Sequence, residues 1–316
     1  MKLLKLFSLM LVATTMAACS SDDNDATPQR PEVRALSFEV SETPYAIPNG
    51  SRITRAAIAS SLDRFYLNYV YLLGSEPQTN GSSMETTKDG EKGWKVGDGS
   101  IGWPGTGNTV DWYACSENVP FNTSGPYINF SVNETASNQK DLLVATASGT
   151  YAETGGKLSF TFDHVCSALR IYVKKANNLA DYTLTVSEVK LCNVLSQGDY
   201  YFNTSSWTLG DTKSDYTLYS GAGLTLGTES FVPLDDSSAP YLFLLPQTLT
   251  AWSGDGEPAN TYLELTCVIN KGGEVHNGKA YIPFGAVLKK GYEYDVNINI
   301  GKNSLYKGGG TKIIPS

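Results

Sequence analysis

Hydrophobic and polar residues alternate in short runs from residue 36 onwards. In the first run, Leu36, Phe38 and Val40 alternate with polar residues, which is the period-two pattern of a strand with one buried face. A longer and more apolar alternating run follows at residues 65–73. The segment between the two runs is rich in Pro, Asn and Gly and carries arginines, so it predicts an exposed loop.

This succession of strand, loop and strand predicts a site of proteolysis, because exposed loops are where proteases cut most readily. A cut there would free the first strand to leave. The strand that pairs with it would then present an open edge of unpaired backbone groups. The alternative is a surface loop whose arginines have no role in processing.

Further strand-like runs follow at intervals of roughly ten residues with turn residues between them, a spacing typical of β-sandwiches. The first series is residues 93–96, 110–115, 127–132, 142–147, 158–164 and 169–174. The second series is residues 182–192, 200–202, 217–219, 230–232, 241–245, 261–270, 279–283 and 292–300. The polar segment 175–181 separates the series, so we expect an all-β chain with sandwiches at residues 56–175 and 176–316.

The N-terminus has the pattern of an exported lipoprotein. A basic start precedes an apolar run that is too short to span a bilayer comfortably, and the run closes on small residues and Cys19. This arrangement resembles the bacterial lipobox, which implies a signal peptide at residues 1–18 and a lipid, such as palmitate, on Cys19. Residues 19–35 then form a polar tether, and their acidic start resembles the export signals of some Gram-negative surface lipoproteins. An ordinary secretory signal is the alternative.

Composition narrows the function classes. The net charge is −8 and the lysines are scattered, which argues against nucleic-acid binding. The 19 Tyr and 30 Gly favour strands and turns over helices. After Cys19 no apolar run is long enough to cross a membrane as a helix.

The sequence offers little catalytic or metal-binding chemistry. It has only two histidines, His164 and His276, and no CxxC pair, so we expect neither a metal site nor another cofactor. A glycine pattern at residues 97–102 matches a dinucleotide motif, but Trp103 and Pro104 follow where a helix should open. Four cysteines lie in strand-like runs: Cys115, Cys166, Cys192 and Cys267. They are either buried free thiols or include one disulfide, and the sequence does not decide between the two.

Five tryptophans leave a further choice open. Trp side chains stack on sugars in glycan-binding proteins, and they also fill sandwich cores and loop contacts. The sequence alone does not separate these uses for Trp94, Trp103, Trp112, Trp207 and Trp252.

Several short motifs recur in an order that resembles the fimbrillin family, the lipoprotein pilins of type V fimbriae on Gram-negative gut and oral bacteria. Thr54-Arg55-Ala56 precedes the strand at 65–73, and Gln139–Ala145 is the most distinctive run. The other motifs are Gly102-Trp103-Pro104 before residues 110–114, residues 158–164 leading into 167–169, Leu245-Pro246-Gln247 and residues 288–294.

The resemblance implies two transthyretin-like Greek-key β-sandwich domains and a non-enzymatic protein of the outer membrane surface and fimbrium. It implies that an arginine-specific protease cuts after an arginine, by position Arg55, so that Ala56 becomes the new N-terminus. Arg34 and Arg52 are the competing sites. The lipid on Cys19 and the strand bearing Leu36, Phe38 and Val40 would leave with residues 19–55, and a strand of another fimbrial subunit would fill the groove. A host or bacterial surface receptor or glycan is the further partner that adhesion implies.

The C-terminal end departs from the stalk subunits of that family. After the last strand-like run, residues 301–316 are short and glycine-rich for a strand that must fill a neighbour's groove. We therefore expect a tip or accessory subunit; a stalk subunit that donates residues 292–300 and an uncut base anchor are the rivals. The alternative of a different class is a surface glycan-binding lipoprotein of a polysaccharide-uptake system.

Overall fold

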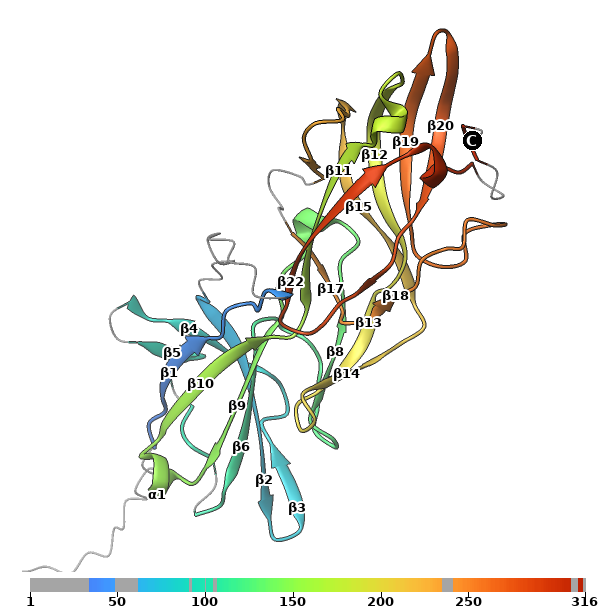
Figure 1. Ribbon diagram of the computed structural model, residues 1–316. Coiled ribbons are helices and arrows are strands. Elements are labelled where there is room, and N and C mark those ends of the chain that lie inside the picture. Colours follow the sequence, from blue (N-terminus) through green and yellow to red (C-terminus); the bar gives the residue numbers. More distant parts are fainter. Residues whose placement is uncertain are drawn as a thin grey trace, which may run out of the picture. The chain divides into compact units, whose positions relative to one another are not determined.

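The structure, a computed structural model, describes residues 34–48, 62–90, 93–99, 101–104, 107–234, 241–307 and 312–314. These residues are almost entirely strands and turns, which confirms the expected all-β class. The alternating runs form strands because one face of each can be buried while the other stays in water. Figure 1 shows the strands and their connections.

The first sheet has eight strands. Seven of them follow the order β1-β10-β9-β6-β2-β4-β5, and β3 also pairs with β2. Its strands are β1 Ser37–Glu42, β2 Arg64–Leu73, β3 Glu76–Thr79, β4 Met84–Lys88, β5 Trp94–Val96, β6 Val110–Cys115, β9 Leu143–Gly149 and β10 Lys157–His164. A short helix, α1 Tyr151–Thr154, connects β9 to β10 and begins with a capping box between Thr150 and Glu153.

Four smaller sheets contain the remaining strands, in the orders β16-β11-β17, β15-β12-β19-β20, β14-β13-β8-β7 and β18-β21. Strand β22 belongs to the first of these sheets and pairs with β11. Their strands are β7 Phe121–Asn122, β8 Tyr127–Ser131, β11 Ser167–Lys175, β12 Thr183–Leu195, β13 Gln197–Tyr201, β14 Ser206–Leu209, β15 Lys213–Thr225, β16 Val232–Pro233, β17 Leu242–Leu244, β18 Thr248–Leu249, β19 Tyr262–Lys271, β20 Glu274–Pro283, β21 Ala286–Val287 and β22 Glu293–Ile300. Single 3₁₀ turns lie at Ala136–Asn138, Asn177–Leu179 and Lys302–Ser304.

Two clusters of buried side chains stabilise these sheets. We call them the first core, built around Phe65, Trp112 and Phe160, and the second core, which includes Leu191 and Leu265. Burial of such side chains is the main favourable term in folding.

Successive segments of the chain contribute buried residues to the first core and the second core in turn. Cys115 and Ile128 already belong to the second core, residues 158–162 return to the first, and Val165 and the residues after it belong to the second. Strand β11, which precedes residue 176, pairs with β22 and lies in the second core. The division at 175/176 stays a prediction about separable domains.

Most predicted strands appear in the structure, several with extended ends. The strand at 110–115 matches β6, while the run at 217–219 is only the middle of the longer β15. Strands β3, β4 and β14 are not among the predicted strands, because β3 and β4 are polar and β14 has only four residues. None of the helices in the described residues is long and apolar enough to cross a membrane.

Candidate functional site: the edge strand β1

Strand β1 lies at the edge of the first sheet and runs parallel to β10 (Figure 1). The pairing extends over six residues, from Ser37 opposite Lys157 to Glu42 opposite Phe162. Two further backbone hydrogen bonds extend it, from the Ser37 amide to the Gly156 carbonyl and from the Thr43 amide to the Phe162 carbonyl, at 2.9 and 2.8 Å. The first predicted strand is therefore part of the sheet.

Strand β10 depends on β1 for most of its pairing. On its other side it pairs with β9 only through Asp163 and His164. Within the described part of the chain, residues 157–162 have β1 as their one strand partner. Loss of β1 would leave both edges of this stretch open, and unpaired backbone groups beside a core are costly.

The apolar side chains of β1 cover the first core. Leu36, Phe38 and Val40 are half-buried and pack against it. The Phe38 ring lies 5.8 Å from the Phe65 ring, edge to face, and 6.2 Å from the Phe160 ring, stacked. These three side chains are those that the alternation placed on the buried face.

The outer face of β1 is polar. The Glu39 carboxylate lies 2.9 Å from the Lys157 ammonium and accepts a 3.3 Å hydrogen bond from the Ser159 hydroxyl. The hydrogen bond and charge of Lys157 lower the pKa of Glu39. Both side chains are exposed, so this pair orients the strand without contributing much to stability.

A glycine makes room for the chain as it enters β1. Gly156 has φ +81°, a conformation that residues with a Cβ rarely adopt. A Cβ on Gly156 would also overlap the carbonyl oxygen of Ala35. Gly156 is not among the predicted site residues, although the Gly155-Gly156 doublet after α1 is a visible turn signal.

The segment that leaves β1 contacts three distant parts of the chain, at Asp141, at His164 and at residues 291–293. The Tyr45 hydroxyl donates a 2.8 Å hydrogen bond to the Asp141 carboxylate, whose second oxygen lies 2.5 Å from His164 Nδ1. Burial, and then the charge of Asp141, raise the pKa of Tyr45. Ala46 exchanges two backbone hydrogen bonds with the start of β22, to Gly291 and from Glu293, at 2.8 and 2.9 Å. No local sequence pattern indicates these contacts.

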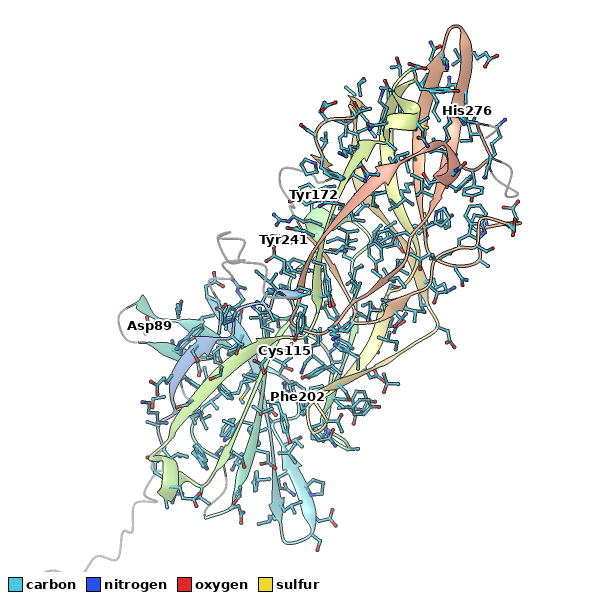
Figure 2. All side chains as sticks on the ribbon, in the orientation of Figure 1. Asp89, Cys115, Tyr172, Phe202, Tyr241 and His276 are labelled. Atoms are coloured by element: carbon cyan, nitrogen blue, oxygen red, sulfur yellow. The ribbon has the colours of Figure 1, made fainter. Side chains whose placement is uncertain are left out.

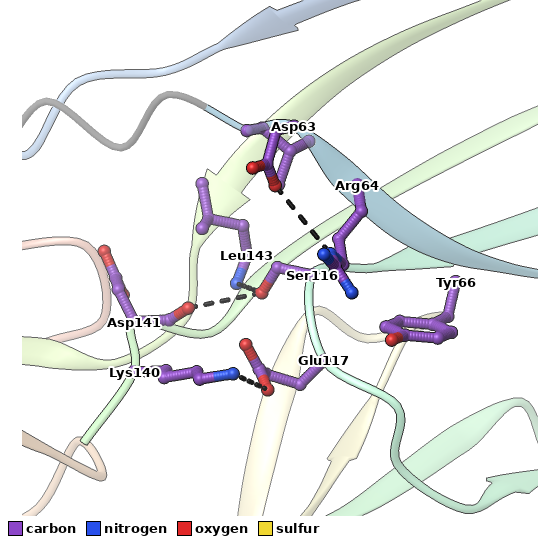
Figure 3. A pocket seen from close by; sticks show the side chains of 9 residues that line it. Asp63, Arg64, Tyr66, Ser116, Glu117, Lys140, Asp141 and Leu143 are labelled. Atoms are coloured by element: carbon purple, nitrogen blue, oxygen red, sulfur yellow. Dashed lines mark hydrogen bonds and ion pairs between the residues drawn. The ribbon is translucent and has the colours of Figure 1, made fainter. Parts of the chain in front are cut away.

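A shallow polar pocket lies beside the point where the described chain resumes, and Figure 3 shows it from close by. It measures about 380 Å³ and includes Leu62, whose amide donates to the Glu42 carboxylate at 3.1 Å. Its charges are paired: Lys140 lies 3.4 Å from Glu117 (Figure 3). The hydrogen bond from the Leu62 amide ties the end of β1 to the segment just before β2.

The other predicted site residues lie elsewhere. Cys19, Arg55 and Ala56 are outside the described residues, as is Arg52. Arg34 is described; its carbonyl accepts from the Trp103 amide at 2.8 Å and its guanidinium lies 5.2 Å from the centre of the Tyr151 ring.

The C-terminal tail packs onto the second core. Tyr306 and Tyr281 exchange backbone hydrogen bonds of 2.9 and 3.0 Å, and the Tyr306 ring lies 5.3 Å from the Trp252 ring. Leu305 and Ile314 are buried in the second core. The described part of the tail is therefore engaged within its own subunit.

The structure answers the question of the cysteines and shows where the tryptophans lie. Cys115, Cys166, Cys192 and Cys267 are all free and buried. Trp103 and Trp112 are buried in the first core, and Trp94 and Trp207 are half-buried against the first and the second core. Trp252 is buried outside both clusters, against Tyr262, Tyr281 and Tyr306. Among the described residues, no group of His, Cys, Asp and Glu is arranged to hold a metal ion.

Comparisons with known proteins agree with this architecture. A protein-family model described as fimbrillin-like matches residues 69–313. A fimbrial protein from Bacteroides vulgatus has a similar structure, with 16% sequence identity and a TM-score of 0.55; the match covers 85% of this chain and 96% of that one. For a candidate cell adhesion protein from Bacteroides ovatus the identity is 16%, the TM-score 0.48 and the coverage 86% and 94%. No protein with a curated description matches the sequence.

The likeness of the Bacteroides vulgatus structure concerns the fold alone, since its sequence identity is low. The family model covers far more than half of the sequence and begins within β2, so it spans nearly all of the described strands. The chain therefore belongs to the fimbrillin-like family.

Proposed function

We propose that this chain is a non-enzymatic fimbrial subunit of the cell surface that assembles by strand exchange after proteolysis. The observation that carries the proposal is the position of β1, which is an edge strand, covers the first core and is the one described strand partner of residues 157–162. Such a strand can be replaced by another of similar pattern, because backbone pairing sets the affinity and side-chain pockets set the register.

In this proposal the cut falls between Arg55 and Ala56, which lie in the sequence between β1 and β2. Release of β1 exposes the ring faces of Phe65 and Phe160 and the edge of β10. A strand from a neighbouring subunit then restores the apolar cover and the hydrogen bonds together. Two transthyretin-like Greek-key sandwiches are the architecture that fits this role.

The lipid has a transient role in this scheme. A lipid on Cys19 holds the precursor at the outer membrane, and it leaves with the segment that precedes the cut. A Cys19→Ser chain should leave the membrane fraction and lose palmitate labelling. Retention of both would show that Cys19 is not the lipid site.

We further propose a tip or accessory position, with a contribution to adhesion. The contacts of Tyr306, Leu305 and Ile314 hold the tail on its own second core, so the tail is not offered to a neighbour. Strand β22 is the rival donor; it pairs with β11 over eight residues, and its removal would open the second core. A subunit that receives a strand and offers none belongs at one end of a fibre, and loss of the lipid makes that the distal end.

The test is limited digestion with an arginine-specific protease, followed by mixing the product with itself. The wild-type chain should give a new N-terminus at Ala56, and an Arg55→Ala chain should not. The cut protein should form no ladder of oligomers on a non-boiled gel. A ladder that disappears on deletion of residues 292–316 would support a stalk role, and an intact chain after digestion would count against cleavage.

Electron microscopy tests the assignment to a fibre. Antiserum against the protein should label surface fibres, at their ends for a tip subunit. Label confined to the cell surface with no fibres would favour the alternative of a glycan-binding lipoprotein in a polysaccharide-uptake system.

A further inference from the structure

The geometry points to a binding site for a neutral saccharide in a pocket of about 380 Å³ between the β3–β4 turn and the chain after β6. We call it the amide pocket; its lining residues are 68, 80–83, 118–121 and 123. The site deepens the adhesion part of the proposed function and rests on it, but it requires neither cleavage nor strand exchange.

One wall of the amide pocket is fixed by an asparagine that takes the place of a strand. Along one edge of β2, residues 64–67 pair with β4 and residues 70–73 pair with β3, which leaves a gap between them. The Asn80 side chain fills the gap: its oxygen accepts from the Tyr69 amide at 3.0 Å and its nitrogen donates to the Leu67 carbonyl at 3.1 Å. The turn that carries Asn80 is thereby held in place.

The base of the pocket contains a buried amide with unused hydrogen-bonding capacity. Asn68 lies on the face of β2 opposite the first core and is only 5% exposed. Its oxygen accepts from the Ser83 hydroxyl at 3.1 Å and from Asn80 Nδ2 at 3.4 Å. Among the described residues its amide nitrogen has no partner. Over the residues that the structure describes, the fully buried side-chain atoms without a partner are Trp112 Nε1 and Tyr216 Oη, so the Asn68 amide nitrogen is accessible from the pocket and can donate to a ligand or water there.

The opposite wall combines exposed polar groups with an ordered ring. The Asn118 and Thr123 side chains are exposed, and Pro120 lies between them in the sequence. The Phe121 ring is half-buried and is held by Tyr113 and Phe202 at centroid distances of 5.2 and 6.0 Å. Phe121 and Pro120 supply the apolar part of this wall.

The lining selects the chemical class of the ligand. None of the residues that line the amide pocket carries a charge, so it offers no ion pair to a phosphate, sulfate, carboxylate or amine. Amides and hydroxyls donate and accept, as sugar hydroxyls do, and an apolar surface suits the C–H face of a sugar ring. The volume lies within the range of small-ligand sites, so a mono- or disaccharide fits better than an extended peptide.

The experiment titrates the full mature chain by calorimetry with maltose, lactose, cellobiose, mannobiose and diacetylchitobiose, each at millimolar concentration. Sialyllactose and a neutral Gly-Ser peptide serve as comparators. Asn118→Ala removes an exposed amide of the pocket, and Ser82→Trp places a large ring in its mouth. Asn203→Ala and Ser75→Trp make the same changes at exposed positions outside the pocket.

We expect at least one neutral disaccharide to bind, with an affinity that Asn118→Ala lowers about tenfold, as for one lost hydrogen bond. Ser82→Trp should abolish binding, and both control variants should bind like the wild type. Absence of binding by every neutral saccharide overturns the inference, as does binding that Ser82→Trp leaves intact or preference for the peptide. Saccharide binding does not require cleavage, so the wild type and Ser82→Trp should both be cut after Arg55. If neither is cut, the result counts against the proposed function and not against the saccharide site.

Discussion

The rings of Tyr45 and His164 stack with their centroids 3.9 Å apart and their planes 24° from parallel. Asp141 joins the pair, since its carboxylate accepts from the Tyr45 hydroxyl and lies beside His164 Nδ1. The segment that leaves β1 is thus held by a buried polar contact as well as by the sheet. Departure of β1 would break this contact too.

Tyr45→Phe should lower the free energy of unfolding by about 2 kcal/mol, because the buried Asp141 carboxylate loses a hydrogen bond while the ring stays. Tyr45→Ala should cost about 3–4 kcal/mol, because the ring is lost as well. Urea unfolding measures both. Tyr201→Phe is the control, since the Tyr201 ring packs on Tyr127 and its hydroxyl has no partner among the described residues. Equal effects of Tyr45→Phe and Tyr201→Phe would contradict this role.

Gly156→Ala should weaken the pairing of β1 specifically. Gly155 and Gly156 both have positive φ, but a Cβ meets the Ala35 carbonyl only at Gly156, while at Gly155 it meets open space. We expect about 1 kcal/mol of destabilisation for Gly155→Ala and about 3 kcal/mol for Gly156→Ala. Hydrogen exchange of the β1 amides should rise more in Gly156→Ala. Identical exchange in the two variants would show that the close approach does not matter.

Arg170 clamps β11 to β22. Its guanidinium lies 2.9 Å from Asp295 and 3.1 Å from Glu293, and it lies 5.8 and 4.5 Å from the Tyr172 and Tyr241 rings, which are labelled in Figure 2. Arg170→Met should lower stability by about 3 kcal/mol, because two largely buried carboxylates lose their cation. The effect should persist in high salt.

The exposed pair of Arg64 and Glu85, 3.2 Å apart, is the matched control for Arg170. Arg64→Met should change stability by less than about 1 kcal/mol. Similar losses from the two substitutions would contradict the burial argument.

Burial raises the pKa of the Cys115 thiol from its ordinary value of 9.0 to about 12. Native protein should therefore resist iodoacetamide at pH 8, and all four buried cysteines should react after denaturation. A thiol with a raised pKa stabilises the fold below pH 9, and this contribution is lost as the pH rises towards about 12. Stability should fall over that window, and Cys115→Ala should fall less. Labelling of Cys115 in the native protein would contradict the burial.

Alternation was enough to find the strands with one buried face. Leu158, Phe160 and Phe162 are buried and their neighbours are exposed along β10, as the pattern requires. The same reading identified Leu36, Phe38 and Val40 as the buried side of β1. Local periodicity carries this information because successive side chains of a strand point to opposite faces, and apolar residues recur on the face that is buried.

Long-range pairing could not be predicted in the same way. The parallel contacts of β1 with β10 and of β11 with β22 join distant segments, and no local pattern encodes them. Asn80 lies in a polar segment between strands, and no local pattern shows that its side chain replaces part of a strand. Tyr45 is an isolated aromatic in a polar segment, and its partners are known only once the fold brings Asp141 and His164 to it.

The central claim is that β1 is exchangeable once the chain is cut, and its most direct measurement is peptide binding. A fluorescent peptide of residues 35–48 is added to intact protein and to protein treated with the arginine-specific protease, and anisotropy is followed. We expect the cut protein to bind the peptide and the intact protein not to bind it. A Phe38→Asp peptide should fail to bind, because its carboxylate would face Phe65 and Phe160. Equal binding by cut and intact protein, or no binding after release of the native segment, would contradict it.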